Sequence, residues 1–117
     1  MISKKKSKNE TVQIITKRHR DMNGGHNHVI LEEFEGNYLS VGFTTKVKKG
    51  NNSTNKKLDF DPFGKGADSY MRRQGTVDKI KNYSRRTRKG QMSKRNYSTA
   101  LEYGRRAKNK FLQKNKK

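Results

Sequence analysis

Residues 28–45 read HVILEEFEGNYLSVGFTT, and this stretch decides the fold. It holds two runs rich in β-branched and aromatic residues, His28 to Phe34 and Tyr38 to Thr45, on either side of Glu35-Gly36-Asn37. In the second run apolar residues alternate with polar or small ones, which is typical of a strand with one buried face. The stretch therefore predicts a β-hairpin with a three-residue loop.

Strand signals also occur on both sides of this hairpin. Toward the N-terminus, Val12-Gln13-Ile14-Ile15-Thr16 has the β-branched content of a strand and leads into the basic cluster Lys17-Arg18-His19-Arg20. Toward the C-terminus, Ser69 to Val77 is predicted to be a strand. Between them, Lys46 to Lys57 is predicted to be a polar loop and Asp61-Pro62-Phe63-Gly64 a turn.

The last third of the chain predicts a basic loop followed by one amphipathic helix. The loop runs from Lys79 to Lys89, and Ser93 is placed as the helix N-cap. Residues that recur at three- and four-residue spacing after it are Tyr97, Ala100, Leu101, Gly104, Ala107 and Phe111. We therefore expect a mainly β fold with a C-terminal α-helix, built as a small barrel or half-open roll.

Composition limits both the size and the partners of the molecule. A chain of 117 residues with 27% hydrophobic residues has room for one small core. We expect a single domain over residues 12–113, a disordered basic tail over residues 1–11, and a second basic tail over residues 114–117. The net charge of +20, from 30 lysines and arginines against 10 acidic residues, favours a polyanionic partner, RNA above all.

Two sequence features exclude whole classes of protein. There is no cysteine, so disulfide frames, thiolate metal sites and cysteine nucleophiles are excluded. No apolar run approaches the roughly 18 residues that a membrane-spanning helix needs, and no apolar stretch follows the N-terminal lysines. We therefore expect a cytoplasmic protein with no membrane partner.

Four segments of the chain, taken in order, carry a family resemblance. They are Gly25-His26-Asn27-His28-Val29-Ile30-Leu31, Ser40-Val41-Gly42-Phe43-Thr44-Thr45, Ser69-Tyr70-Met71-Arg72-Arg73-Gln74-Gly75-Thr76-Val77-Asp78 and Lys89-Gly90-Gln91-Met92-Ser93. Together, over residues 25–107, they resemble the PemK/MazF family of toxin endoribonucleases from type II toxin-antitoxin systems. The resemblance implies an SH3-like barrel with helices packed outside it, a homodimer, and an acidic antitoxin as partner.

The chain departs from the family pattern at one place. Before the second strand the family presents an arginine followed by proline, and that arginine serves catalysis. Here the place holds Asn27-His28, so Arg18, Arg20 or another basic side chain would have to replace the arginine.

Candidate catalytic residues come from the chemistry of metal-free RNA cleavage. This reaction needs a base, an acid, and donors for the charged phosphorane. Histidine titrates near neutral pH, and all three histidines lie close in sequence to two arginines. The residues assigned to catalysis are Arg18, His26, His28 and Thr44. The alternative is that His19, His26 and His28 are solvated loop residues.

The histidines and the basic segments also bear on metal and nucleic-acid binding. The His26-X-His28 spacing occurs in metal sites, and His19 would be a third ligand, but zinc sites need further fixed ligands, so we expect no metal and no cofactor. Tyr83 would be a surface on which a base stacks, within a basic segment that contains no acidic residue. The predicted nucleic-acid contacts are Arg20, Thr45, Arg72, Arg73, Lys79, Lys81, Tyr83, Arg85, Arg86, Arg88 and Lys89.

Three interpretations of function remain open from the sequence. The first is an RNA-binding protein that resembles a toxin endoribonuclease and cleaves single-stranded RNA without metal. The second is a non-catalytic nucleic-acid-binding barrel from a phage or mobile element. The third is a structural protein of a phage or ribonucleoprotein particle.

Overall fold

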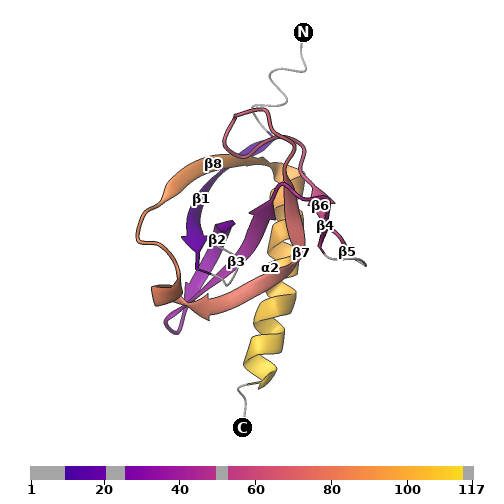
Figure 1. The fold of residues 1–117 in the computed structure, drawn as a ribbon. Helices are drawn as coiled ribbons and strands as arrows, with labels where there is room; N and C mark the ends of the chain where they lie inside the picture. Colours follow the sequence, from indigo (N-terminus) through magenta and orange to yellow (C-terminus); the bar gives the residue numbers. More distant parts are fainter. Residues whose placement is uncertain (1–9, 21–25, 50–52, 115–117) are drawn as a thin grey trace.

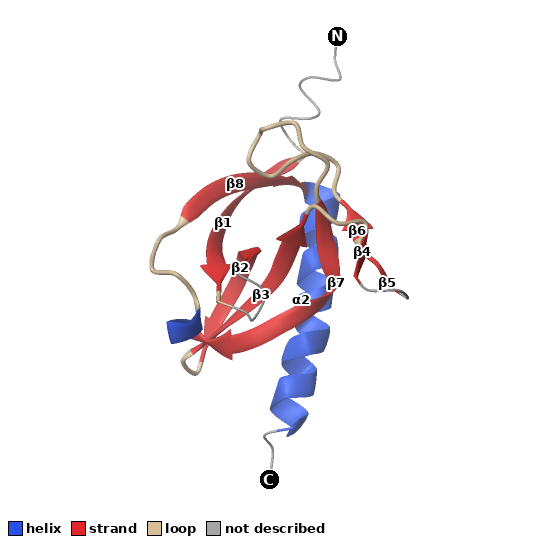
Figure 2. Cartoon of the chain, viewed as in Figure 1, coloured by secondary structure: helices blue, strands red, loops and turns tan. Residues whose placement is uncertain are grey.

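A computed structural model describes residues 10–20, 26–49 and 53–114 of the chain. Strands dominate it, and a single long helix ends it (Figure 2). The elements are β1 (Thr11–His19), β2 (His26–Phe34), β3 (Asn37–Thr44), β4 (Lys48–Lys49), β5 (Ser53–Thr54), β6 (Lys56–Lys57), β7 (Tyr70–Lys79), the 3-10 helix η1 (Ile80–Asn82), β8 (Arg88–Ser93) and α2 (Lys94–Lys114). The predicted class, mainly β with a C-terminal helix, is confirmed.

The predicted hairpin forms, with a tighter turn than the sequence suggested. Strands β2 and β3 pair in antiparallel fashion, and Phe34 lies opposite Asn37. The loop therefore has two residues, Glu35 and Gly36, so the three-residue prediction is wrong. Both have positive φ, 52° and 79°, as a primed turn requires, and this turn matches the twist of the paired strands.

The main sheet is antiparallel and strongly curved, with the strand order β6-β7-β3-β2-β1-β8 (Figure 1). Strand β1 pairs with β8 along residues 11–16 and with β2 along residues 16–19. Beyond Thr16, the C-terminal end of β1 no longer pairs with β8. Backbone hydrogen bonds from Arg20 N–H to the Asn82 carbonyl and from Ser84 N–H to the Arg18 carbonyl hold it on that side instead.

Three sequence predictions need correction or extension. The Lys46–Lys57 segment is not only loop, since it contains β4, β5 and β6, and β6 adds to the sheet through Met71 and Tyr70. The basic loop predicted to reach Lys89 ends earlier, because β8 begins at Arg88 and pairs with β1. The strand predicted over 69–77 is found as β7, which starts one residue later and runs on to Lys79.

The core lies where the sheet meets α2. Its buried members are Ile14, Val29, Val41, Phe43, Leu58, Met71, Met92 and Ala100. The helix packs closely on β7, because Gly75 and Gly104 let the two backbones approach each other. A Cβ at Gly75 would lie 3.0 Å from the Gly104 Cα and 2.9 Å from the Tyr103 carbonyl oxygen.

The helix begins as predicted. The Ser93 hydroxyl oxygen accepts a hydrogen bond from the Asn96 N–H at 3.1 Å, which is the N-cap geometry. The predicted apolar face is only partly buried, since Ala100 and Gly104 are buried whereas Leu101 is exposed. Most of the predicted N-terminal tail, residues 1–9, and residues 115–117 of the C-terminal tail lie outside the described residues. Within the described part of the chain, no helix is long and apolar enough to cross a membrane.

Candidate nucleic-acid pocket

A hollow of about 360 Å³ is lined by the ends of β1, β2 and β3, the loop of residues 61–69 and the start of β8. We call it the Phe63 pocket. Its cationic side chains are Arg18, Lys46, Lys65 and Arg88, its apolar side chains are Phe43, Pro62, Phe63 and Ala67, and its other polar residues are His26, Asn27, Thr44, Thr45, Asp61 and Ser69. Four cationic groups against one carboxylate make the hollow attractive to anions.

The wall of the pocket is built around Asp61. Its carboxylate accepts hydrogen bonds from the backbone N–H groups of Phe63 at 3.0 Å, Lys65 at 3.0 Å and Ala67 at 3.3 Å. Burial alone would raise the pKa of Asp61, but these three bonds and the charge of Arg88 outweigh it and lower the pKa. Asp61 therefore stays ionised and holds the loop, which makes it unsuitable as a proton donor.

The Phe63 ring is one of the four apolar side chains of the pocket. The Arg88 guanidinium carbon lies 3.8 Å above the centre of the Phe63 ring, and Phe43 meets the same ring edge-on with centroids 6.4 Å apart. The loop is fixed to β8 by a bond from Gln91 N–H to the Pro62 carbonyl at 2.9 Å. A planar guanidinium and an aromatic ring are thus held next to each other, as in sites that recognise nucleotides.

Three of the four residues predicted to be catalytic line this pocket: Arg18, His26 and Thr44. The hydroxyl oxygen of Thr44 accepts a bond from Lys46 N–H at 3.1 Å, which leaves the hydroxyl proton to donate elsewhere. Arg18 lies directly opposite Asn27 in the β1–β2 pairing. Its guanidinium therefore lies on the strand next to Asn27.

The fourth predicted catalytic residue, His28, lies elsewhere. It is 5% exposed and belongs to a buried polar cluster that we call the histidine network, made of His19, His28, Ser40, Asp78, Asn82 and Tyr83. The Ser40 hydroxyl lies 2.9 Å from His28 Nδ1 and 2.8 Å from the Tyr83 hydroxyl. His28 does not reach the pocket, so its assignment to catalysis is corrected to a structural role.

The other half of the network is centred on the carboxylate of Asp78. His19 Nε2 lies 2.8 Å from Asp78 Oδ2, and Asp78 Oδ1 accepts from Lys79 N–H and from Asn82 Nδ2. Burial would raise the pKa of Asp78, yet the hydrogen bonds, led by that from His19, lower it. The His19 ring connects the two halves of the network. Its centroid lies 4.9 Å from that of the His28 ring and 4.6 Å from that of the Tyr83 ring.

The network is complete as a hydrogen-bonded unit. Burial, together with the nearby charge of Asp78, raises the pKa of Tyr83 to about 12, against the opposing effect of the bond to Ser40. A Cβ at Gly42 would lie 2.9 Å from His28 Nε2, so glycine is required there for the imidazole to fit. Within the described residues, every buried side-chain nitrogen and oxygen has a hydrogen-bond partner. Such a network favours one packing arrangement over others.

Few of the residues predicted to contact nucleic acid line the Phe63 pocket. Thr45 and Arg88 do, whereas Arg20 is an exposed residue directly after β1. The remaining cations lie on β7, on η1, in the loop before β8 and on β8, namely Arg72, Arg73, Lys79, Lys81, Arg85, Arg86 and Lys89. Tyr83 is 3% exposed and offers no stacking surface, so that prediction is wrong.

Phe43 and Phe63 are the aromatic residues that line the pocket, and neither was predicted from the sequence to be a site residue. The signal available for Phe63 was the Asp61-Pro62-Phe63-Gly64 segment, which was predicted only to be a turn. The zinc alternative finds no support, because the described residues contain no group of three histidines or acidic residues able to hold a metal ion.

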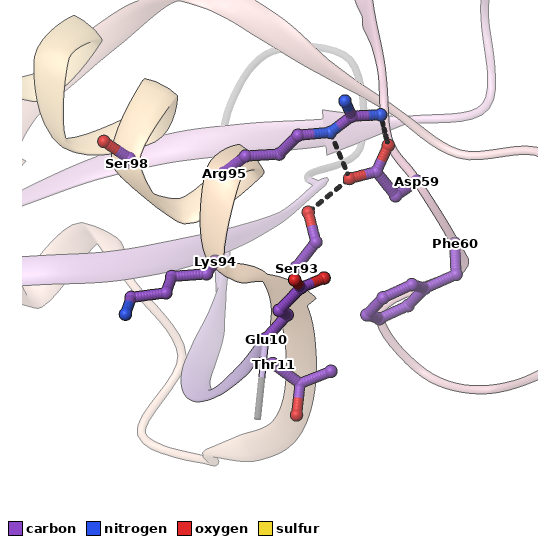
Figure 3. A pocket seen from close by; sticks show the side chains of 8 residues that line it. All are labelled: Glu10, Thr11, Asp59, Phe60, Ser93, Lys94, Arg95 and Ser98. Carbon is purple, nitrogen blue, oxygen red and sulfur yellow. Dashed lines mark hydrogen bonds and ion pairs between the residues drawn. The ribbon is translucent and has the colours of Figure 1, made fainter. Parts of the chain in front are cut away.

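A larger hollow, about 740 Å³, lies at the start of α2 and is held together by a salt bridge (Figure 3). Arg95 donates from Nε to Asp59 Oδ2 at 2.9 Å and from Nη2 to Oδ1 at 2.6 Å, and the Ser93 hydroxyl donates to the same carboxylate. The bond from Arg95, which outweighs the effect of burial, lowers the pKa of Asp59 to about 2. This carboxylate anchors the loop to the helix and is ionised near neutral pH.

Comparison with protein-family models, with curated proteins and with solved structures gave no match to this chain.

Proposed function

We propose that this protein binds single-stranded RNA in the Phe63 pocket and cleaves it there without a metal ion. The observation that carries the proposal is that Arg18, His26 and Thr44 line one cationic hollow together with Phe63. These residues come from three different strands and a loop. They combine a titratable imidazole, a guanidinium, a hydroxyl donor and an aromatic ring.

Each group has a role in binding. A base stacks on Phe63 and Arg88, a contact worth about 1–3 kcal/mol per base in single-stranded complexes. The adjacent phosphate is held by Arg18, whose fork of donors suits two phosphate oxygens, and by Lys46 and Lys65 as point charges. A duplex would not present an unstacked base to the ring, so a single strand is the substrate that fits.

Cleavage follows from the position of His26 beside these cations. His26 takes the proton of the ribose 2′-hydroxyl, the 2′-oxygen bonds to phosphorus, and the bond from phosphorus to the 5′-oxygen breaks. Water delivers a proton to that leaving oxygen, while Arg18 and the Thr44 hydroxyl stabilise the charged phosphorane. The products are a 2′,3′-cyclic phosphate and a 5′-hydroxyl.

The family resemblance extends this proposal. The element order and the strongly curved sheet support an SH3-like barrel of the PemK/MazF type. The position of Arg18 opposite Asn27 supports its use in place of the family's arginine. The homodimer and the acidic antitoxin belong to the same proposal and have their basis in the resemblance alone.

The test is an RNA cleavage assay in the presence of EDTA. The wild-type protein is expected to cut a single-stranded RNA, to leave the DNA of the same sequence intact, and to yield cyclic phosphate ends. Arg18→Ala and Thr44→Val should each slow cleavage. Arg20→Ala should not, because Arg20 is an exposed residue after β1 that does not line the pocket. Equal rates for all these variants and the wild type would reject the site.

A second candidate function has one observation in its favour. Only one histidine, His26, lines the pocket, so the described pocket residues hold a single imidazole for a reaction that moves two protons. The candidate is a non-catalytic nucleic-acid-binding protein of a phage or mobile element. Binding that falls steeply with salt and leaves RNA intact would select it.

A further inference from the structure

The second half of α2 presents most of its surface to solvent. The buried residues of the helix all lie in its first half, and they are Asn96, Ala100 and Gly104. In residues 105–114 the ring of Phe111 packs edge-on against that of Phe34, with centroids 5.9 Å apart, and holds this half to the sheet. The end of the helix extends past the strands (Figure 1). One long face of residues 105–114 is therefore open to a partner.

Three long polar side chains follow one another along this open face. They are Arg105, Asn109 and Gln113, which are all exposed. A spacing of four residues makes them neighbours on the helix, on the side opposite to Ala107 and Phe111. Arginine pairs with the major-groove edge of guanine, and asparagine and glutamine pair with that of adenine. The open face thus carries side chains that read bases in duplex DNA.

The length of this row also suits a duplex. Eight residues of helix separate Arg105 from Gln113, which corresponds to a rise of about 12 Å. Base pairs of DNA follow one another at about 3.4 Å, so the row is as long as about three base-pair steps. Successive side chains can therefore meet successive base pairs.

The same half of the helix carries charge of one sign. Residues 105–114 contain no aspartate or glutamate. Among the described residues, no acidic side chain forms an ion pair with Arg105, Lys110 or Lys114. Lysines four residues apart, as Lys110 and Lys114 are, destabilise a helix by repulsion. Phosphates beside them would relieve this repulsion.

A hollow of about 340 Å³ lies beside the reading face, between β7 and α2. Its charged side chains are all cationic, namely Arg73, Arg106, Lys110 and Lys114. Contacts to phosphates fix a protein on a duplex without reading the sequence, whereas contacts to base edges specify the sequence. The helix therefore has a face for each of these two tasks, and the two faces are adjacent.

We propose that the protein binds duplex DNA by placing the second half of α2 in the major groove. Arg105, Asn109 and Gln113 contact base edges there, while Lys110 and Lys114 contact phosphates of one strand. The major groove of B-form DNA is about 12 Å wide and admits an α-helix. The site shares no residue with the Phe63 pocket and does not depend on the function proposed for that pocket.

Two forms of RNA fit this face less well. An RNA duplex has a deep and narrow major groove, which side chains cannot read. A single strand is held by stacking of its bases on aromatic rings. The aromatic residue of this half of the helix, Phe111, packs on Phe34 instead. Duplex DNA is therefore the nucleic acid that this face suits.

The experiment selects DNA duplexes from a pool with a randomised centre by binding to the full-length protein, and measures their affinity by fluorescence anisotropy. We expect the selected duplex to bind at least about tenfold more tightly than the same duplex with a scrambled centre, because one bidentate base contact discriminates by about this factor. The RNA duplex of the selected sequence should bind more weakly than the DNA. Failure to select any sequence, or equal binding of the RNA duplex, would overturn the proposal.

Variants locate the site on α2. Asn109→Ala and Gln113→Ala should each reduce the preference for the selected duplex over the scrambled one. Lys110→Ala should weaken both duplexes alike and lower the salt dependence of binding by about one phosphate contact. The matched control is Gln13→Ala, at an exposed glutamine of β1, which should change neither quantity.

A further variant separates this site from the pocket. Arg18→Ala should leave binding of duplex DNA unchanged, whatever it does to RNA. An undiminished sequence preference in both Asn109→Ala and Gln113→Ala would overturn the assignment of base reading to α2.

Discussion

His26 and His28 are separated by one residue of β2, yet they belong to two different regions of the molecule. His26 is half-buried and lines the cationic Phe63 pocket. His28 is 5% exposed and bonds to Ser40 inside the histidine network. One imidazole is therefore accessible to a ligand, and the other is fixed by packing.

The contrast extends to the charged groups of the two regions. In the pocket, one carboxylate, that of Asp61, is used by the backbone of its own loop, and the cations remain in excess. In the histidine network, the carboxylate of Asp78 is hydrogen-bonded to His19, Lys79 N–H and Asn82, so its oxygens are all used within the protein. An unbalanced cluster at the surface attracts a partner, while a balanced one in the interior stabilises the fold.

Replacing His26 should give the largest effect on activity. His26→Gln should lower RNA cleavage by about 100-fold or more, since general base catalysis contributes roughly this much. It should leave the free energy of unfolding within about 0.5 kcal/mol of wild type, as for surface substitutions away from buried features. Single-turnover cleavage and urea unfolding measure the two quantities. Cleavage at the wild-type rate would remove His26 from the mechanism.

Replacing His28 should have its main effect on stability. His28→Ala leaves a cavity beside Gly42 and removes a partner of the buried Ser40 hydroxyl, so we expect a loss of about 3 kcal/mol in unfolding free energy. Urea unfolding measures it, with His26→Ala as the matched control. A stable His28→Ala protein that has lost only cleavage would contradict the division between the two regions.

The phenol of Tyr83 gives the histidine network a signature at alkaline pH. Because its pKa is raised from 10.0 to about 12, the neutral phenol stabilises the fold below pH 10, and this contribution is lost as the pH rises through 12. The stability difference between wild type and Tyr83→Phe should shrink by about 3 kcal/mol over that range. Urea unfolding of both proteins at a series of pH values measures this difference. A difference in unfolding free energy that stays constant from pH 10 to 12 would mean that the Tyr83 phenol is solvated.

The smallest effect is expected at the loop anchor near α2, which belongs to neither region. The pKa of Asp59 is lowered to about 2, so its ionised form stabilises the fold above the ordinary value of 3.8. That contribution is lost as the pH falls from 3.8 through 2. Solvent screens this pair, so Asp59→Asn should cost only about 1 kcal/mol at neutral pH. The cost should vanish in strong acid. An unchanged cost would mean that the substitution acts instead through the hydrogen bond from Asp59 N–H to Asn96 Oδ1, which is 2.7 Å long.

The parts of the fold that depend on neighbouring residues were predictable from the sequence. The alternation of residues 38–45 and the turn signal at Glu35-Gly36-Asn37 predicted the hairpin, although not its two-residue loop, and Ser93 predicted the start of α2. The residues of the pocket were partly predictable, because Arg18 and His26 lie in flanking strands that pair with each other. Strand β8 was missed, since its basic and polar sequence becomes a strand only by pairing with β1.

The division between the two histidines was not predictable. Alternation along a strand places residues two apart on the same side, so nothing in the His26-Asn27-His28 spacing distinguishes them. The distinction comes from long-range partners: Ser40 across the hairpin for His28, and Phe63 from a distant loop beside His26. The link from His19 to Asp78 spans 59 residues and leaves no local pattern.

The most direct test of the central claim is to locate RNA on the molecule by photocrosslinking. A single-stranded RNA is irradiated with the wild-type protein, and the attached peptides are identified by mass spectrometry. The account predicts crosslinks at Phe63 and in the segment of residues 43–46, both reduced by Arg18→Ala. Crosslinks confined to α2 and β7, with none at Phe63, would contradict it.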